Sequence, residues 1–348
     1  MKRIVQIILG LSMVSALLIL LGPEETRETL SMITPAAMTV LFSFQLATLA
    51  AGAWIWHLLL TRKSRISFAR VFIINQAAGL VESLTPSVKF GGEAAKVYLF
   101  RKKTRQTYHE IAGVLLVQKF ITMIPFALLC LIIIVPALYL FSINFLFTAA
   151  FILLLSVCLA LGWLCYGSTG AGSSPAKTDQ LQAGIIKRPM FALRFWISKA
   201  FFFISQARQS AAGLLSVRQT LVALSVSLAI WAFYPVKVYL ACHFLGFEIS
   251  PGIIVLATFL AYMISMIPLS PGGLGTYEGT MAMLLTIGGV SPAEGLAIAL
   301  VSRLTTFWFP LGLSALASMI VLWSPGTDEY REGRSAITGQ QQFDCRLS

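Results

Sequence analysis

Residues 267–278 have the sequence IPLSPGGLGTYE and interrupt a long apolar tract with residues that break helices. Proline lacks the N–H that a helix needs, and glycine loses the most backbone entropy on folding. Non-helical backbone persists at membrane depth only where protein or a watered cavity covers it, because an unsatisfied peptide group in hydrocarbon costs several kcal/mol. Glu278 follows this break, and an intramembrane carboxylate indicates a functional site.

The composition around this tract is that of a polytopic membrane protein. Of 348 residues, 57% are apolar and 11% are charged, whereas a soluble domain has about 25% charged residues. The net charge of +12 is concentrated in loops, which predicts contact with anionic lipid headgroups and no nucleic-acid partner. The five cysteines and three histidines form no metal, disulfide or catalytic pattern. We therefore expect no metal, no cofactor and no enzymatic activity.

The charges between apolar runs predict the orientation in the membrane. The run 4–21 is expected to be a retained helix and not a cleaved signal peptide. A mostly acidic loop follows it, and a second run, 35–60, leads to a basic loop. The positive-inside rule then places the N-terminus and the basic loop in the cytoplasm and the acidic loop outside.

Two tracts do not fit simple spans. Residues 71–100 lie between two basic loops and carry charged residues about a centre of Pro86 and Gly91-Gly92, which predicts a re-entrant hairpin entered from the cytoplasm. Residues 251–289, broken at Pro271-Gly272-Gly273, either cross twice or form a second hairpin entered from outside. Glu82, Lys89 and Lys96 are expected near the cytoplasmic base of the first hairpin, where they are more easily hydrated than Glu93. Ordinary spans are expected at 111–140, 145–166, 221–244 and 293–323.

The expected fold is all-α, with about six to eight membrane helices that include two re-entrant hairpins in an inverted repeat. Residues 1–324 form one transmembrane domain, with halves at about 35–166 and 219–323 joined by the basic cytoplasmic loop 167–218. Within that loop, 191–204 is either an amphipathic helix in the headgroup region or a linker. The tail 325–348 is expected to be disordered and cytoplasmic.

The two halves match in order, spacing and charge. Glu93 precedes Lys119 by 26 positions (119 − 93), and Glu278 precedes Arg303 by 25 (303 − 278). The span before the first hairpin runs inward and that before the second runs outward, so the repeats are inverted. Interrupted segments at corresponding places in inverted halves indicate a transport site near the midplane. Half-helix N-termini facing that site would favour an anionic group.

The candidate substrate-binding residues are the charged residues of this repeat and the residues of its two breaks. They are Glu93, Lys119, Glu278, Arg303, Gly91, Gly92, Pro271, Gly272, Gly273 and Gly275. Two other interpretations remain open. The four charged residues can form two internal salt bridges that pin the repeats together, and the glycines can simply permit close helix packing. These structural roles and a binding role can coexist.

The strings SLTPSVKFGGEAAK at 83–96 and PLSPGGLGTYE at 268–278 resemble a known family. They are similar to the flippase-like transmembrane region of bacterial lysylphosphatidylglycerol synthases, and the likeness runs from about Asn75 to Trp323. The resemblance implies a polytopic fold with re-entrant helices. It also implies a role in moving phospholipid or polyprenyl-linked headgroups across the cytoplasmic membrane.

The chain departs from that family in one place. Members often carry an acid–base pattern in the third span, but Val117-Gln118-Lys119 has no acidic neighbour, so substrate coupling at this site is not carried over. The aminoacyl-transferase domain of the fused synthases has no room in this chain. We therefore expect a member that lacks this domain and does not transfer lysine.

The leading expectation is a lipid flippase of the bacterial inner membrane that takes an anionic or zwitterionic headgroup. Arg303 and Lys119 would neutralise phosphate, and Glu93 and Glu278 would meet an amine or a proton. The expected partners are membrane lipids, and a separate lipid-modifying enzyme is a candidate. The alternatives are a membrane-embedded enzyme subunit for lipid-linked sugars and a non-transporting scaffold that recruits a partner through 167–218. The lipid, the direction, the coupling ion and the oligomeric state stay open.

Overall fold

The computed structural model describes residues 22–62, 64–84, 90–104, 106–140, 214–267 and 270–323, with a few single residues and short pieces elsewhere. Within these ranges all regular structure is helical and there is no strand, so the protein is an all-α, polytopic membrane protein. Most of the run 4–21 lies outside the described residues, as do most of the loop 167–218 and the whole tail 325–348. The predictions for 145–166 and 191–204 also fall outside them.

Four helices in the described part are long and apolar enough to cross a membrane. They are α3 (Pro35–Leu60), α6 (Tyr108–Leu140), α9 (Val217–Phe244) and the joined helix Pro292–Trp323. Their bounds agree with the predicted spans to within a few residues. The joined helix consists of α12 (Pro292–Arg303), the π-helix η3 (Leu304–Trp308) and α13 (Phe309–Trp323).

The starts of these helices have local causes. Thr34 accepts a hydrogen bond from the Ala37 amide at 3.2 Å, and Pro35 occupies the first helical position of α3, where its missing N–H is no loss. Ser216 is the N-cap residue before α9 and Ser291 is the N-cap residue before α12, and each takes part in a reciprocal capping box.

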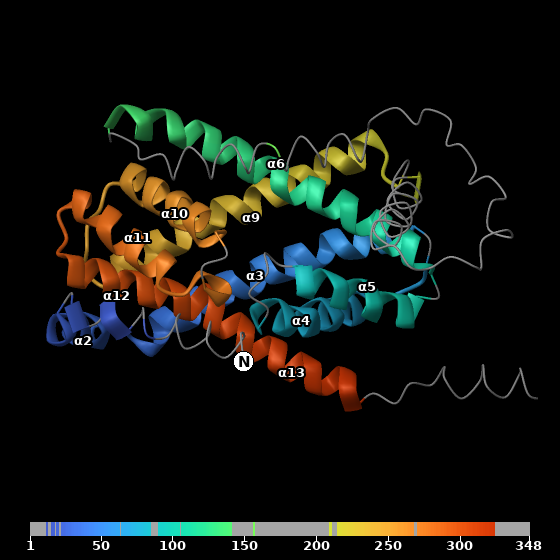
Figure 1. Ribbon diagram of the computed structural model, residues 1–348, viewed down its shortest axis with the longest axis horizontal. Coiled ribbons are helices and arrows are strands. Elements are labelled where there is room, and N and C mark those ends of the chain that lie inside the picture. The colour runs from blue at the N-terminus through green and yellow to red at the C-terminus, as the bar shows by residue number, and fades with distance from the viewer. Residues whose placement is uncertain are drawn as a thin grey trace, which may run out of the picture.

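Two helical pairs have arms too short to cross. The first pair is α4 (Phe68–Leu84) with α5 (Phe90–Thr104), and the second is α10 (Pro251–Ser265) with α11 (Thr276–Leu285). A spanning helix needs about 20 residues, so the chain must turn back at each break. Both arms of each pair lie at one end of the bundle, and the two pairs occupy opposite ends (Figure 1). The tract 251–289 therefore forms a hairpin and does not cross twice.

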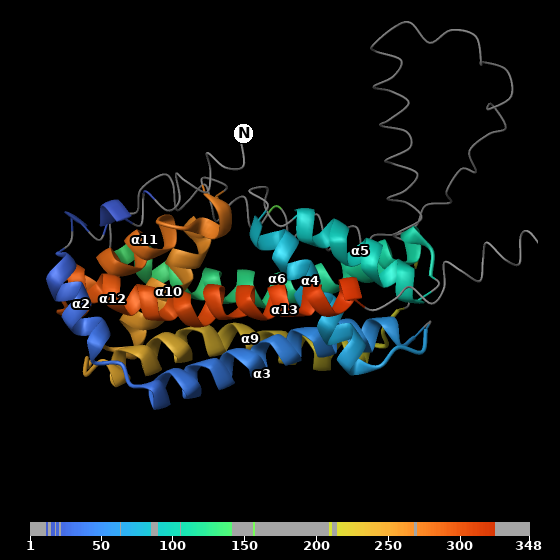
Figure 2. The same ribbon diagram turned by 90° about the horizontal axis from the view of Figure 1, so that it is seen from below.

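The long helices run side by side along the long axis of the molecule (Figures 1 and 2). The joined helix 292–323 links the two hairpins, because α12 packs against α11 while α13 packs against α4. Gly79 makes the second contact close, since a Cβ there would lie 2.9 Å from Ser314 Oγ. The π-helix η3 stands between these two contacts and was not predicted. A π-bulge is a common site of bending in a helix.

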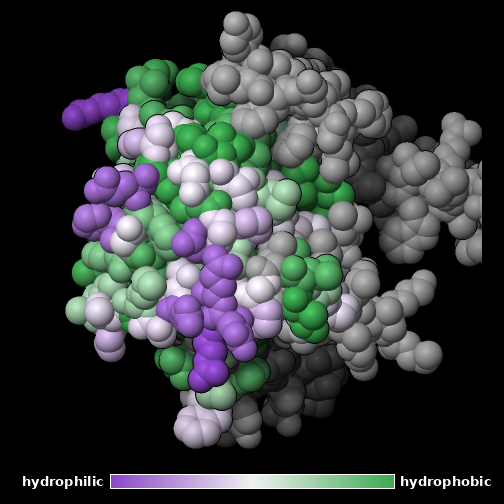
Figure 3. Space-filling model, turned by 90° about the vertical axis from the view of Figure 1, so that its left-hand side faces the viewer, coloured by the Kyte–Doolittle hydropathy of each residue, from purple (hydrophilic) through white to green (hydrophobic). Residues whose placement is uncertain are grey.

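The two ends of the bundle differ in charge. The short helix α2 (Pro23–Ser31) packs on α12 and exposes Glu24, Glu25 and Glu28 beside Arg27. Figure 3 faces this end and shows hydrophilic residues gathered among hydrophobic ones. The opposite end, where α3, α4 and α5 meet, exposes cations instead: Arg62, Arg65, Arg70, Arg101 and Lys102.

Candidate functional site

Positive backbone torsions form the break of the second hairpin. The 3-10 turn η1 (Pro271–Gly273) holds Gly272 at φ 64° and Gly273 at φ 67°, and Gly275 follows at φ 82°. Only glycine adopts such angles readily, because it has no Cβ. A Cβ on Gly273 would also lie 2.5 Å from Ser265 Cβ on α10. The glycines therefore set both the turn and the close approach of the two arms.

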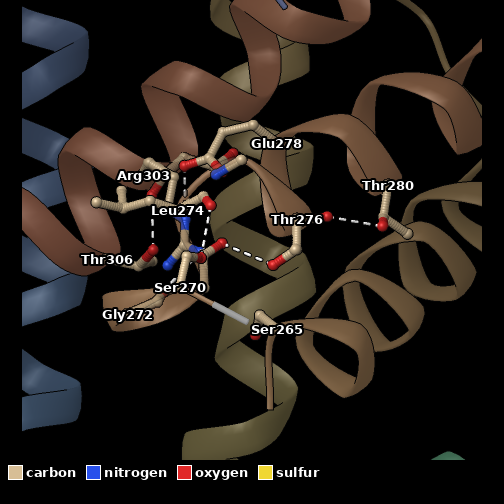
Figure 4. A network of polar contacts seen from close by, with 12 residues as sticks. Ser265, Ser270, Gly272, Leu274, Thr276, Glu278, Thr280, Arg303 and Thr306 are labelled. Atoms are coloured by element: carbon tan, nitrogen blue, oxygen red, sulfur yellow. Dashed lines mark hydrogen bonds and ion pairs between the residues drawn. The ribbon is translucent and has the colours of Figure 1, made fainter. Parts of the chain in front are cut away.

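Arg303 closes this break from the neighbouring helix α12. Its Nε donates to Glu278 Oε1 at 3.0 Å, and its Nη2 donates to the carbonyl oxygens of Gly272 and Gly273, both at 2.9 Å (Figure 4). The residues Arg303 and Glu278 are 4% and 1% exposed. The guanidinium thus donates to two backbone oxygens of the break, and Gly273 O also accepts a hydrogen bond from Thr276 Oγ1 at 3.0 Å. Such pairing matters because an unsatisfied peptide group in hydrocarbon costs several kcal/mol.

The remaining contacts of this ion pair are also internal. The second carboxylate oxygen of Glu278 accepts the Gly275 N–H at 2.6 Å, at the N-terminus of α11. A carboxylate is favourable there because of the helix dipole. The ring of Tyr277 lies 4.1 Å from the guanidinium carbon of Arg303, a cation–π distance. Glu278 therefore already occupies the half-helix N-terminus that was predicted to face an anionic ligand.

The first hairpin has its own ion cluster. Glu93 Oε1 lies 2.5 Å from Lys119 Nζ of α6 and 3.4 Å from Lys96 Nζ, and Lys96 also reaches Glu82 Oε2 at 3.8 Å. Gly92 lets α5 approach α4 closely, since a Cβ there would meet Glu82 Cβ at 2.4 Å.

Lys96 is a correction to the sequence interpretation. It was expected near the cytoplasmic hairpin base and more easily hydrated than Glu93, but it is buried, as Glu93 is. Its ammonium lies between the carboxylates of Glu82 and Glu93 and 5.9 Å from the ring of Trp56 on α3. Tertiary packing of α5 against its neighbours, and not sequence position, decides its exposure.

Both hairpin glutamates are therefore paired with the cation predicted to match them. The interpretation as two internal salt bridges describes these contacts, while the predicted substrate-binding role stays a prediction. The two pairs differ in accessibility. The Arg303 and Glu278 side chains are 5% and 1% exposed, whereas that of Lys119 is 23% exposed. The Glu93 Oε2 atom is buried and has no hydrogen-bond partner among the described residues.

The other predicted residues belong to the two breaks. Gly91 lies in the first turn of α5, and Pro271 begins η1. The described contacts assign the glycines Gly92, Gly272, Gly273 and Gly275 to backbone geometry and packing. Within the described residues no group of three or more His, Cys, Asp or Glu could hold a metal ion.

One polar contact in the membrane was missed by the sequence analysis. Lys237 Nζ of α9 donates to Gln45 Oε1 of α3 at 2.6 Å and to Thr48 Oγ1 at 3.4 Å. Gln45 and Thr48 are three positions apart, so they share one helix face. Two polar residues at this spacing in an apolar span, with a lysine deep in another span, were the available signal.

The fold and these paired hairpins define a polytopic membrane protein with two opposed, interrupted helical segments. The chain belongs to the family of the lysylphosphatidylglycerol synthase TM region, whose model matches residues 5–314. A UPF0104 membrane protein of Methanothermobacter thermautotrophicus is 24% identical over 90% of this chain and 95% of its own length. A UPF0104 membrane protein of Pyrococcus horikoshii is 22% identical over 91% of this chain and 96% of its own length. Family membership and a multi-pass membrane location are thus shown.

Proposed function

We propose that this protein is a lipid translocase, which moves phospholipid or polyprenyl-linked headgroups across the cytoplasmic membrane. One observation carries the proposal. Two hairpins that enter the bundle from opposite ends each place a glutamate against a cation of the following helix. Paired interruptions of this kind mark transport sites in transporters built from inverted repeats. Membership of a family named for a lipid synthase supports a lipid as the transported molecule.

The first hairpin is the proposed contact for the headgroup. Two ammonium groups, Lys96 and Lys119, converge on one oxygen of Glu93, and the Lys119 side chain is the more exposed of these. A lipid phosphate can take the place of Glu93 as the partner of Lys119 because both are oxyanions. Glu93 is then available to an amine or a proton. The buried Arg303–Glu278 pair holds the second hairpin in shape.

The proposal predicts that lipid movement depends on Lys119. Proteoliposomes would carry fluorescent phosphatidylglycerol, its lysyl and zwitterionic analogues, or a polyprenyl phosphate. We expect Lys119→Gln to slow transbilayer movement by about 10- to 100-fold, since a hydrogen bond to a charged group is worth about 1.5–3 kcal/mol. Glu93 keeps Lys96 as a partner in this variant, so the hairpin should still fold.

Lys102→Gln is the matched control, because Lys102 is an exposed lysine at the end of α5, and it should flip lipid at the wild-type rate. Wild-type protein that moves no lipid faster than empty liposomes would contradict the translocase proposal. A scaffold or an enzyme subunit would then be the better interpretation.

The proposed orientation places α2 outside and the α3–α4 loop in the cytoplasm of a bacterial cell. In a variant without native cysteines, a membrane-impermeant maleimide should label Glu28→Cys in intact cells. It should label Ser67→Cys only after permeabilisation, because the cations around that loop hold it on the cytoplasmic side. Both positions are exposed in the structure. The opposite labelling pattern would contradict the orientation.

A further inference from the structure

Lys237 is a buried amine that the proposed lipid site does not use. It lies well inside α9 and is 1% exposed. Gln45 and Thr48 of α3 accept its hydrogen bonds, and its Nζ lies 4.0 Å from the centroid of the Tyr234 ring. All three partners are uncharged. Lys237 therefore differs from Lys96, Lys119 and Arg303, the other cations that lie between the helices of the bundle.

Those other cations each have a carboxylate as partner. Lys96 and Lys119 reach Glu93, and Arg303 reaches Glu278, all within 4.0 Å. Within the described residues Lys237 has no such ion pair. The cost of removing a charge from water falls on the protonated amine alone, and neutral partners offset it only in part. No carboxylate partner among the described residues thus holds Lys237 in its protonated form.

Lys237 lies where a helix of the first half contacts a helix of the second half. Helix α3 precedes the first hairpin and α9 precedes the second, and the two helices pack side by side (Figure 2). The hydrogen bonds from Lys237 to Gln45 and Thr48 therefore join the two halves. A protonated amine donates to both partners and interacts with the Tyr234 ring. A neutral amine loses that cation–π interaction and can instead accept a hydrogen bond from Thr48.

The surroundings contain few other groups that could take this proton. α9 packs against α3, α6, α10 and α12. The Tyr234 ring beside Lys237 contacts Tyr262 of α10, with ring centroids 4.9 Å apart, and Tyr262 contacts Tyr277 of α11 at 5.1 Å. The other titratable or charged groups inside α9 and these elements include Cys130, Cys242, Lys119 and Arg303. The two cations are paired with Glu93 and Glu278. Glu82 of α4 pairs with Lys96, and His57 and His243 lie near helix ends.

We propose that Lys237 is a proton-binding site that couples a transmembrane proton gradient to lipid movement. The inference rests on the proposed translocase function and adds its coupling ion. The neutral amine takes a proton from one aqueous side and becomes an ammonium. It returns the proton to the other side after the two halves have moved, so that no other atom or electron is exchanged. A purely structural contact between α3 and α9 would need no change of charge.

Two variants separate these roles. Lys237→Gln keeps hydrogen-bonding capacity toward Gln45 and Thr48 but cannot titrate, and Lys237→Met removes both. In proteoliposomes with a difference of about one pH unit, wild-type protein should build a lipid asymmetry of up to about tenfold for one proton per lipid, since one unit equals about 1.4 kcal/mol. Lys237→Gln should still move lipid but equalise the two leaflets. Lys237→Met, in which the contact itself is lost, should be less stable than Lys237→Gln.

Two outcomes would overturn the proposal. One is that Lys237→Gln builds the same asymmetry as wild type. The other is that wild-type protein moves lipid but leaves the leaflets equal under the gradient.

A second readout does not depend on transport. In protein labelled with ¹⁵N-lysine and reconstituted in bilayers, the Nζ resonance absent from Lys237→Gln should shift between about pH 5 and about pH 9, because burial without a counter-charge favours the neutral amine. If that resonance stays constant over this range, Lys237 is no proton site. If wild-type protein moves no lipid, the translocase proposal fails by itself, and the resonance still decides whether the proton site exists.

Discussion

Replacement of Arg303 by methionine is expected to lower the free energy of unfolding by about 3–5 kcal/mol, because it leaves a buried charge without its partner. Glu278 would keep its hydrogen bond from Gly275 but lose its cation. The carbonyl oxygens of Gly272 and Gly273 would lose the Nη2 donor at the same time. Equilibrium unfolding in mixed detergent micelles measures this loss.

A double variant tests whether the unpaired charge of Glu278 causes the loss of stability in Arg303→Met. In the double variant Glu278→Gln/Arg303→Met no lone charge is left, so it should be less destabilised than the sum of the two single variants. The carbonyl oxygens remain without Arg303, so wild-type stability should not return. Strictly additive losses would show that the two side chains do not act as a pair.

The second large effect is expected at Gly273. An alanine there must adopt φ 67° and place its Cβ 2.5 Å from Ser265 Cβ and 2.9 Å from the Ser265 carbonyl oxygen. The left-handed backbone costs about 1–2 kcal/mol and the overpacking about 1–3 kcal/mol. Gly273→Ala should therefore lose about 2–5 kcal/mol in the same unfolding measurement. Two of the three nearest atoms belong to the Ser265 backbone and the third is its Cβ, which is fixed to that backbone, so these atoms have little freedom to move.

Two other glycines serve as controls for this prediction. Gly272 has φ 64°, but its Cβ would meet the ring of Phe307, a side chain that can move, so Gly272→Ala should cost less. Gly52 lies inside α3 with nothing within 4 Å of its Cβ position. Gly52→Ala should stabilise the helix by about 0.5–1 kcal/mol. Equal stability of Gly273→Ala and wild type would contradict the role assigned to the break.

The difference between the two ion pairs shapes the functional proposal. Symmetric roles were predicted for Lys119 and Arg303 as phosphate ligands. In the structure Arg303 donates to three oxygen atoms of the second hairpin and is buried, whereas Lys119 keeps a partly exposed side chain. The headgroup role is therefore proposed for the first hairpin alone.

The sequence by itself determined the features that depend on local physics. The spans α3, α6, α9 and 292–323 follow from apolar length, because each lipid-facing helix needs enough apolar residues to cross. The two breaks follow from proline and glycine chemistry. The nearly equal spacing of glutamate and cation in the two halves, 26 and 25 positions, left two internal salt bridges as one of the open interpretations, and the contacts of Glu93 and Glu278 match it.

Only the tertiary structure decided which polar groups are buried and what they contact. The burial of Lys96 depends on how closely α5 packs on α4. The burial of Arg303 depends on where the break places the carbonyl oxygens of Gly272 and Gly273, to which it donates. The π-helix η3 lies between the part of the joined helix that packs on α11 and the part that packs on α4. The contact of Lys237 with Gln45 joins residues 192 positions apart. The spacing of residues along the sequence does not predict such contacts, because they depend on how whole helices pack together.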